Sequence, residues 1–169
     1  MDEIVRISSG VPWEPIFGYS RAVRAGDWVM VSGTTGTDQS GQVVGKGQMY
    51  VQARQAIENI ATALERMGLG LESVVRTRVF VTELDRFSDL ARAHMEMFGE
   101  ARPASTVVQV TRLVHPDMLV EIEADAYAGS VATPALAGKP GIASKAHTPR
   151  KGTKPASAHG RRKSAARGR

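Results

Sequence analysis

The sequence predicts an α+β domain in which two helices cover one face of a single β-sheet. Two segments carry apolar residues at the three- and four-residue spacing of helices, and the others alternate with the period of two typical of strands. Their order along the chain is three strands, a helix, a strand, a helix and two strands. Because each helix has one apolar stripe, the simplest arrangement places both stripes on the same face of the sheet.

Three short extended runs begin the domain. Glycine and proline end the first run, and a loop over residues 13–15 follows. Residues 25–27, Ala-Gly-Asp, separate the next two runs and suit an antiparallel hairpin. Residues 33–48 then form a Gly-rich connection that lacks the spacing of a phosphate-binding loop. The expected strands are residues 4–8, 20–24 and 28–32.

Two helices are predicted, at residues 49–67 and 85–98. Gly68 supplies the stop of the first helix. Asp85 is the expected N-cap of the second, and Gly99 ends it. The apolar stripes are Ala53, Ala56, Ile57, Ile60, Leu64 and Met67 in the first helix and Phe87, Leu90, Ala91, His94 and Phe98 in the second.

The later strands, expected at residues 74–82, 104–111 and 119–128, give the sheet one apolar and one charged face. Alternation in the first of them places Val75, Thr77, Val79 and Val81 on the covered face. The other face carries Arg76, Arg78, Glu121, Glu123 and Asp125. Either this face is solvated and holds cross-strand ion pairs, or it packs against symmetry mates in a closed oligomer.

Charge is unevenly distributed along the 169 residues. Residues 1–129 contain 12 Lys and Arg against 17 Asp and Glu, a net charge of −5, whereas residues 130–169 contain 10 Lys and Arg and no acid. The second segment also loses all periodicity, so we expect a folded domain over residues 1–129 and a basic disordered tail over residues 130–169. The tail suits either a solubilising extension or weak nonspecific nucleic-acid contact.

Composition excludes several kinds of chemistry. The chain has no cysteine, which rules out a thiol nucleophile, a disulfide framework and Cys-ligated metals. His94 lies on a helix stripe and His115 in a turn, and neither belongs to a metal-ligand motif, so no metal site is expected. No apolar run approaches the roughly 20 residues of a membrane span, and no signal-peptide pattern begins the chain. These features favour a cytoplasmic protein without membrane contact.

Five short motifs stand out between residues 7 and 128. They read GYSRAV at residues 18–23, VSG at 31–33, RVFVTEL at 78–84, RPA at 102–104 and VEIEA at 120–124. In this order and spacing they resemble the Rid family of reactive intermediate deaminases, also called the YjgF or RidA family. The resemblance implies a chorismate-mutase-like α+β fold, assembled as a homotrimer with small-molecule pockets at the subunit interfaces.

The resemblance also implies an activity, the hydrolysis of imines and enamines such as 2-aminoacrylate to 2-oxo acids and ammonia without a cofactor or metal. Glu123 matches the water-orienting glutamate of the family and Tyr19 the pocket tyrosine. Gly33 matches a glycine beside the pocket, and backbone near Thr106 and Val107 would line the end that holds the substrate carboxylate. Such a site needs a guanidinium for the carboxylate and an oxygen group that places water.

One position departs from the family pattern. The active branch has an arginine after the Pro-Ala pair, whereas this chain has Ser105. A serine hydroxyl cannot neutralise a carboxylate or bind it with two parallel hydrogen bonds. Either the substrate lacks a carboxylate, or another arginine compensates across an interface. Each arginine that could do so is otherwise a surface or ion-pairing residue, which is the favoured interpretation. The candidates are Arg76, Arg78, Arg102 and Arg112.

The sequence leaves three functions open. The first is a trimeric hydrolase of imines or enamines with an altered substrate, in which Glu123 places water. The second is a non-catalytic ligand-binding or regulatory homologue, which the serine at position 105 favours. The third, nucleic-acid association or cleavage, draws on the basic tail and on ribonuclease activity attributed to some relatives of the family. The absence of an identifiable acid and base pair argues against cleavage.

Overall fold

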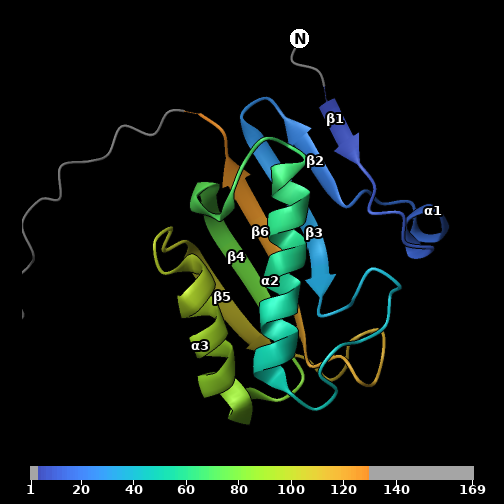
Figure 1. Ribbon diagram of the computed structural model, residues 1–169, viewed down its shortest axis with the longest axis vertical. Coiled ribbons are helices and arrows are strands. Elements are labelled where there is room, and N and C mark those ends of the chain that lie inside the picture. Colours follow the sequence, from blue (N-terminus) through green and yellow to red (C-terminus); the bar gives the residue numbers. More distant parts are fainter. Residues whose placement is uncertain (1–3, 130–169) are drawn as a thin grey trace, which may run out of the picture. The chain divides into compact units, whose positions relative to one another are not determined.

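Six strands form one mixed β-sheet, and two helices lie side by side across one face of it (Figure 1). This computed structural model describes residues 4–129, and the expected tail lies outside the described residues. The strands are β1 (Ile4–Ile7), β2 (Ala22–Ala25), β3 (Trp28–Thr35), β4 (Val74–Val81), β5 (Ala104–Gln109) and β6 (Val120–Tyr127), in the spatial order β1-β2-β3-β6-β4-β5. The helices are α1 (Trp13–Phe17), α2 (Met49–Glu65) and α3 (Phe87–Phe98), with 3-10 turns at Leu71–Ser73 and Leu84–Arg86. The predicted α+β class and single sheet are confirmed.

Strand direction explains why α2 and α3 share a face. Strand β6 runs antiparallel to both β3 and β4, so β3 and β4 are parallel to each other, and β5 is parallel to β4. Helix α2 therefore joins one parallel pair and α3 the next, and both connections move in the same direction across the sheet. Connections between parallel strands are almost always right-handed, which places both helices on one side. The opposite face, here called the open face, is left uncovered by them.

The core lies between α2 and the covered face of the sheet. The whole predicted stripe of α2 is buried, and Ala53, Ile57 and Ile60 have no exposed surface. Alternate residues of β6 from Val120 to Ala126 are also buried, which leaves the acids between them on the open face, as predicted. Among residues 4–129, no helix is both long and apolar enough to cross a membrane.

The predicted loop at residues 13–15 is wrong, because these residues belong to α1. Glu14 is buried there and accepts hydrogen bonds from the backbone and hydroxyl of Ser9 and from the hydroxyl of Ser8. These contacts fold the segment back on the end of β1, and Gly18 ends the helix in the left-handed conformation with φ 78°.

The predicted start of α3 is also wrong. Asp85 lies in a 3-10 turn, and Arg86 occupies the N-cap position without a side-chain cap. The tighter turn places Phe87 at the edge of the helix face, where it is 50% exposed, and Ala93 is buried in the stripe instead.

Two β-bulges shift the predicted strand patterns. In β4, the register changes between Val74 and Arg76, so Val74 is buried and Val75 is exposed, opposite to the prediction. In β3, the strand continues to Thr35, so Gly33 lies inside a strand and not in a connection. A bulge adds one residue to a strand and therefore reverses the alternation beyond it.

Candidate functional site

The bulge in β3 places backbone groups beside the two glutamates of β6. Val31 pairs with Ala124 and Thr34 with Ile122, so Ser32 and Gly33 together lie opposite Glu123. A Cβ atom added at Gly33 would lie 2.1 Å from Oε1 of Glu121. A side chain at position 33 would therefore displace the carboxyl group of Glu121, which ends a flexible side chain.

Arg21 ties the bulge to Tyr19. Its guanidinium donates hydrogen bonds to the Gly33 carbonyl at 2.9 Å, to Thr34 Oγ1 at 3.0 Å and to the Tyr19 hydroxyl at 3.1 Å. The guanidinium carbon also lies 5.5 Å from the centre of the Tyr19 ring. Arg21 lies in the GYSRAV motif, but no role was predicted for it. Two of its partners, Gly33 and Thr34, lie at the β3 bulge, and the residue pattern does not reveal this bulge.

Glu14 lies beside Arg21, with 4.0 Å between Glu14 Oε1 and Arg21 Nε. Burial disfavours the charge of Glu14, but hydrogen bonds from Ser8 and Ser9 and the charge of Arg21 outweigh it and lower the pKa of this carboxyl group. Glu14 is therefore a buried anion that orients the arginine. We name Tyr19, Arg21, Gly33, Glu121 and Glu123 the bulge cluster.

The two glutamates of the bulge cluster lie in different surroundings. Glu123 forms an ion pair with Arg78 at 3.5 Å, and Arg78 also contacts Asp125 at 3.2 Å. For Glu121, burial and then the charge of Glu123 raise the pKa, and the charge of Arg21 opposes them only in part. Neighbouring carboxyl groups whose surroundings differ in this way suit an acid and a base.

The substrate-binding residues predicted on β5 lie on both faces of the sheet. Ser105 pairs with Thr77 and Val107 with Val79, which places both on the covered face. Thr106 pairs with Arg78 and shares the open face with Glu123. Within one chain, the structure thus brings together Tyr19, Gly33 and Glu123 but separates them from Ser105.

Ser105 instead belongs to a chain of hydrogen bonds that ends on α3. The Thr77 hydroxyl lies 2.9 Å from Ser105 Oγ and 3.2 Å from His94 Nε2. Burial lowers the pKa of His94, whose ring packs against Phe98 with 4.8 Å between the ring centres. His94 is thus partly a core residue, as predicted, and also the inner end of a polar chain.

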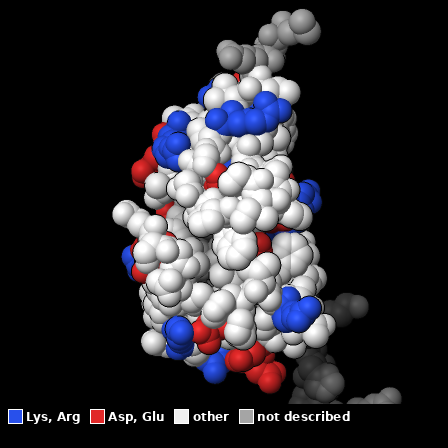
Figure 2. Space-filling view, turned by 90° about the vertical axis from the view of Figure 1, so that its right-hand side faces the viewer, with Lys and Arg blue, Asp and Glu red and all other residues white. Residues whose placement is uncertain are grey.

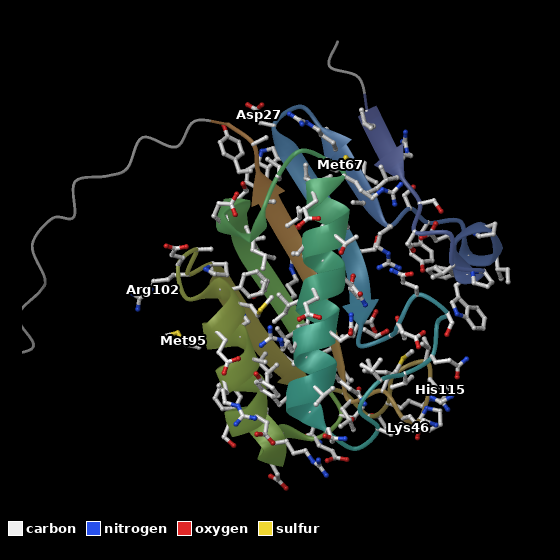
Figure 3. All side chains as sticks on the ribbon, in the orientation of Figure 1. Asp27, Lys46, Met67, Met95, Arg102 and His115 are labelled. Atoms are coloured by element: carbon white, nitrogen blue, oxygen red, sulfur yellow. The ribbon has the colours of Figure 1, made fainter. Side chains whose placement is uncertain are left out.

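The same histidine lines a shallow cavity of about 290 Å³, open to solvent, between the end of α3 and the turn that leads to β5. Figure 3 shows Met95 and Arg102 projecting from the same side of the molecule at this place. The lining residues are His94, Met95, Phe98, Gly99, Arg102 and Pro103. Across residues 4–129, no three His, Asp or Glu side chains are grouped so as to hold a metal ion.

The fold and the bulge cluster define a class of protein, a small single-sheet α+β domain with a polar cluster on the open face of its sheet. The family model described as Endoribonuclease L-PSP matches residues 11–128, so the chain belongs to this family. Its relatives carry the names RutC, UK114 and YjgF, and the motifs identified in the sequence place the chain in the same Rid family.

The relatives match over nearly their full length. An uncharacterised protein of Streptomyces coelicolor is 39% identical over 130 residues, which cover 77% of this chain and 96% of that protein. The 3-aminoacrylate deaminase RutC of Acinetobacter baylyi is 32% identical over 127 residues, 75% of this chain and 99% of that enzyme. A Mycobacterium tuberculosis member of the YjgF/YER057c/UK114 family has a crystal structure with a TM-score of 0.68 and 42% identity, covering 74% of this chain and 99% of that one.

Proposed function

We propose that this chain hydrolyses small imines or enamines to carbonyl compounds and ammonia, with Glu123 placing the attacking water. The observation that carries the proposal is the bulge cluster, which joins Tyr19, Gly33 and Glu123 although they lie far apart in the sequence. A relative named 3-aminoacrylate deaminase supports the same class of reaction.

The two glutamates divide the proton transfers of this reaction. Glu123, held by Arg78, accepts a proton from water as the water oxygen bonds to the C=N carbon. Glu121, whose raised pKa favours the protonated form, donates a proton to the nitrogen. The protonated Glu123 then donates its proton to the nitrogen of the resulting amino alcohol as the carbon–nitrogen bond breaks. The hydroxyl proton passes to the Glu121 carboxylate, and the products are a carbonyl compound and ammonia. An enamine first takes up a proton at carbon to become the imine.

A second copy of the chain completes the site in this proposal. Ser105 and Glu123 lie on opposite faces of the sheet, so they share a pocket only where one subunit meets another. Trp13, Ile16 and Phe17 of α1 are 67%, 75% and 85% exposed, and Figure 2 shows a broad uncharged area on the side where α1 lies. Apolar surface of this kind supports burial between subunits. We infer a homotrimer with three such pockets.

The test generates 2-iminobutanoate in situ and follows the appearance of 2-oxobutyrate with and without the protein. We expect acceleration, and a loss of about 10²- to 10⁴-fold in Glu123→Gln, the usual contribution of a general base. Asp125→Asn is the matched control, because it removes another carboxylate partner of Arg78 on the same face. No acceleration by the wild type, or equal rates for Glu123→Gln and the wild type, would refute the proposal.

A second candidate is a non-catalytic ligand-binding or regulatory role, which Ser105 favours because it replaces the arginine of the active branch. This role predicts binding of 2-oxobutyrate without turnover of the imine. It also predicts that Ser105→Arg creates an activity that the wild type lacks, which then falls again in Ser105→Arg/Glu123→Gln.

A further inference from the structure

The structure distinguishes the four arginines that could replace the missing guanidinium. Arg78 is already paired with Glu123 and Asp125 on the open face. Arg76 lies two residues before it on β4 and shares that face, opposite to Ser105. Arg112 follows β5, whereas Arg102 precedes it, so these two lie at opposite ends of the strand. Of the four, Arg102 lines the cavity beside His94.

The cavity suits a small acid. Its walls are apolar at Met95, Phe98 and Pro103, and Arg102 supplies a permanent positive charge. His94 stays neutral near physiological pH because burial lowers its pKa, so it adds a polar ring without a second charge. A volume of about 290 Å³ accommodates a short-chain ligand but is at the lower limit for larger ones.

The cavity is also connected to position 105. Ser105, Thr77 and His94 form a continuous chain with steps of 2.9 and 3.2 Å on the covered side of the sheet. Thr77 lies between the two, so an arginine at position 105 would begin one side chain away from the histidine that lines the cavity.

Arg102 has an unusual backbone conformation at this place. Its φ is 46°, in the left-handed region, and its N–H donates to the Phe98 carbonyl at 2.8 Å as α3 ends. Glycine is the preferred residue at such a helix end, because a side chain is strained there. Backbone strain held beside a cavity is a common feature of binding sites.

We propose that Arg102 binds the carboxylate of the substrate in place of the arginine that other Rid proteins have at position 105. The ligands are short-chain 2-imino or 2-enamino acids, whose apolar side chain packs on Met95 and Pro103. This inference rests on the proposed function for the identity of the substrate, but the binding of the acid is measured independently of turnover.

The binding test titrates the full chain with 2-oxobutyrate and with its uncharged amide, 2-oxobutanamide, followed by NMR. We expect the acid to bind more tightly than the amide, and binding of the acid to weaken about 10- to 100-fold in Arg102→Gly, the usual loss for a hydrogen bond to a charged group. Arg102→Gly relieves the left-handed strain, so the variant keeps its fold. Arg112→Gln is the control and binds like the wild type.

A rescue variant places the missing charge at the family position. Adding Ser105→Arg to Arg102→Gly should restore preference for the acid over the amide. Unchanged acid binding in Arg102→Gly, or equal binding of acid and amide by the wild type, overturns the inference. If acid binding depends on Arg102 but the protein does not turn over the imine, the role of Arg102 is supported and the hydrolase proposal is refuted. If the protein hydrolyses the imine and Arg102→Gly leaves that rate unchanged, the hydrolase proposal is supported and the role of Arg102 is refuted.

Discussion

Glu14 is buried and Glu121 is half-buried, yet their pKa values move in opposite directions. Glu14 receives hydrogen bonds from Ser8 and Ser9 that outweigh the cost of burial. Burial and the negative charge of Glu123 both disfavour the ionised form of Glu121, and the positive charge of Arg21 offsets only part of this effect. At the scale of single residues, hydrogen-bond donors therefore decide which carboxyl group stays ionised and which favours its proton.

This difference predicts opposite effects on stability for two equivalent substitutions. Because the folded state lowers the pKa of Glu14, its ionised form stabilises the fold above its ordinary pKa, and this contribution is lost as the pH falls through the lowered pKa. Glu14→Gln should therefore destabilise the protein by about 1–3 kcal/mol at neutral pH. The loss should shrink at about pH 3.

For Glu121 the sign is reversed. Its raised pKa means that the protonated form is favoured by folding below the ordinary pKa, and this contribution is lost as the pH rises through the raised value. Glu121→Gln should therefore increase the melting temperature near pH 7 and change it little near pH 4. Thermal unfolding of both variants across this pH range measures whether the two substitutions change the melting temperature in opposite directions. Parallel pH profiles for the two variants would contradict the opposite pKa shifts of Glu14 and Glu121.

At the scale of elements, the bulge in β3 brings the candidate site together. It lets the Gly33 carbonyl accept a hydrogen bond from Arg21, while the carboxyl group of Glu121 lies where a side chain at position 33 would be. Gly33→Ala should displace that carboxyl group, lower the stability by about 1 kcal/mol and move the pKa of Glu121 back toward its ordinary value. The rate of imine hydrolysis by Gly33→Ala should also fall.

A double-mutant cycle measures whether this contact causes the loss. With Glu121→Ala already present, Gly33→Ala should cost little by denaturant unfolding, because no carboxyl group remains to displace. Gly70→Ala is the matched control, since its Cβ would also meet a carboxylate, 2.3 Å from Oε2 of the exposed Glu72. Equal losses for Gly33→Ala with and without Glu121 would show that the bulge backbone itself requires glycine.

At the scale of the whole molecule, the candidate site and the excess of positive charge lie in different parts of the sequence. The candidate site lies in the acidic part of the chain, whereas all 10 Lys and Arg beyond residue 129 lie in a segment without acids. Deleting residues 130–169 should abolish retention on a polyanion such as heparin, with a steep salt dependence in the full chain. The proposed trimer should keep its subunit number in light scattering and its imine hydrolysis. Polyanion binding that persists after the deletion would place that binding within residues 1–129.

Local sequence pattern was enough for most of the fold. The stripe from Ala53 to Met67 predicted α2, and the alternation of apolar residues with Glu121 and Glu123 predicted which side of β6 faces the core. Both patterns depend on neighbours a few residues away, so they can be read without knowing the tertiary structure. The motifs that indicated the Rid family are equally local.

The sequence by itself thus determined the class of fold and the family. Only the tertiary structure decided that Arg21 joins Tyr19 to Gly33, that Ser105 faces away from Glu123, and that Arg102 shares a cavity with His94. Each of these facts depends on a bulge, a strand register or a helix end that brings distant residues together. A shift of one residue in a strand turns a side chain to the other face of the sheet, and residue types alone do not encode that shift.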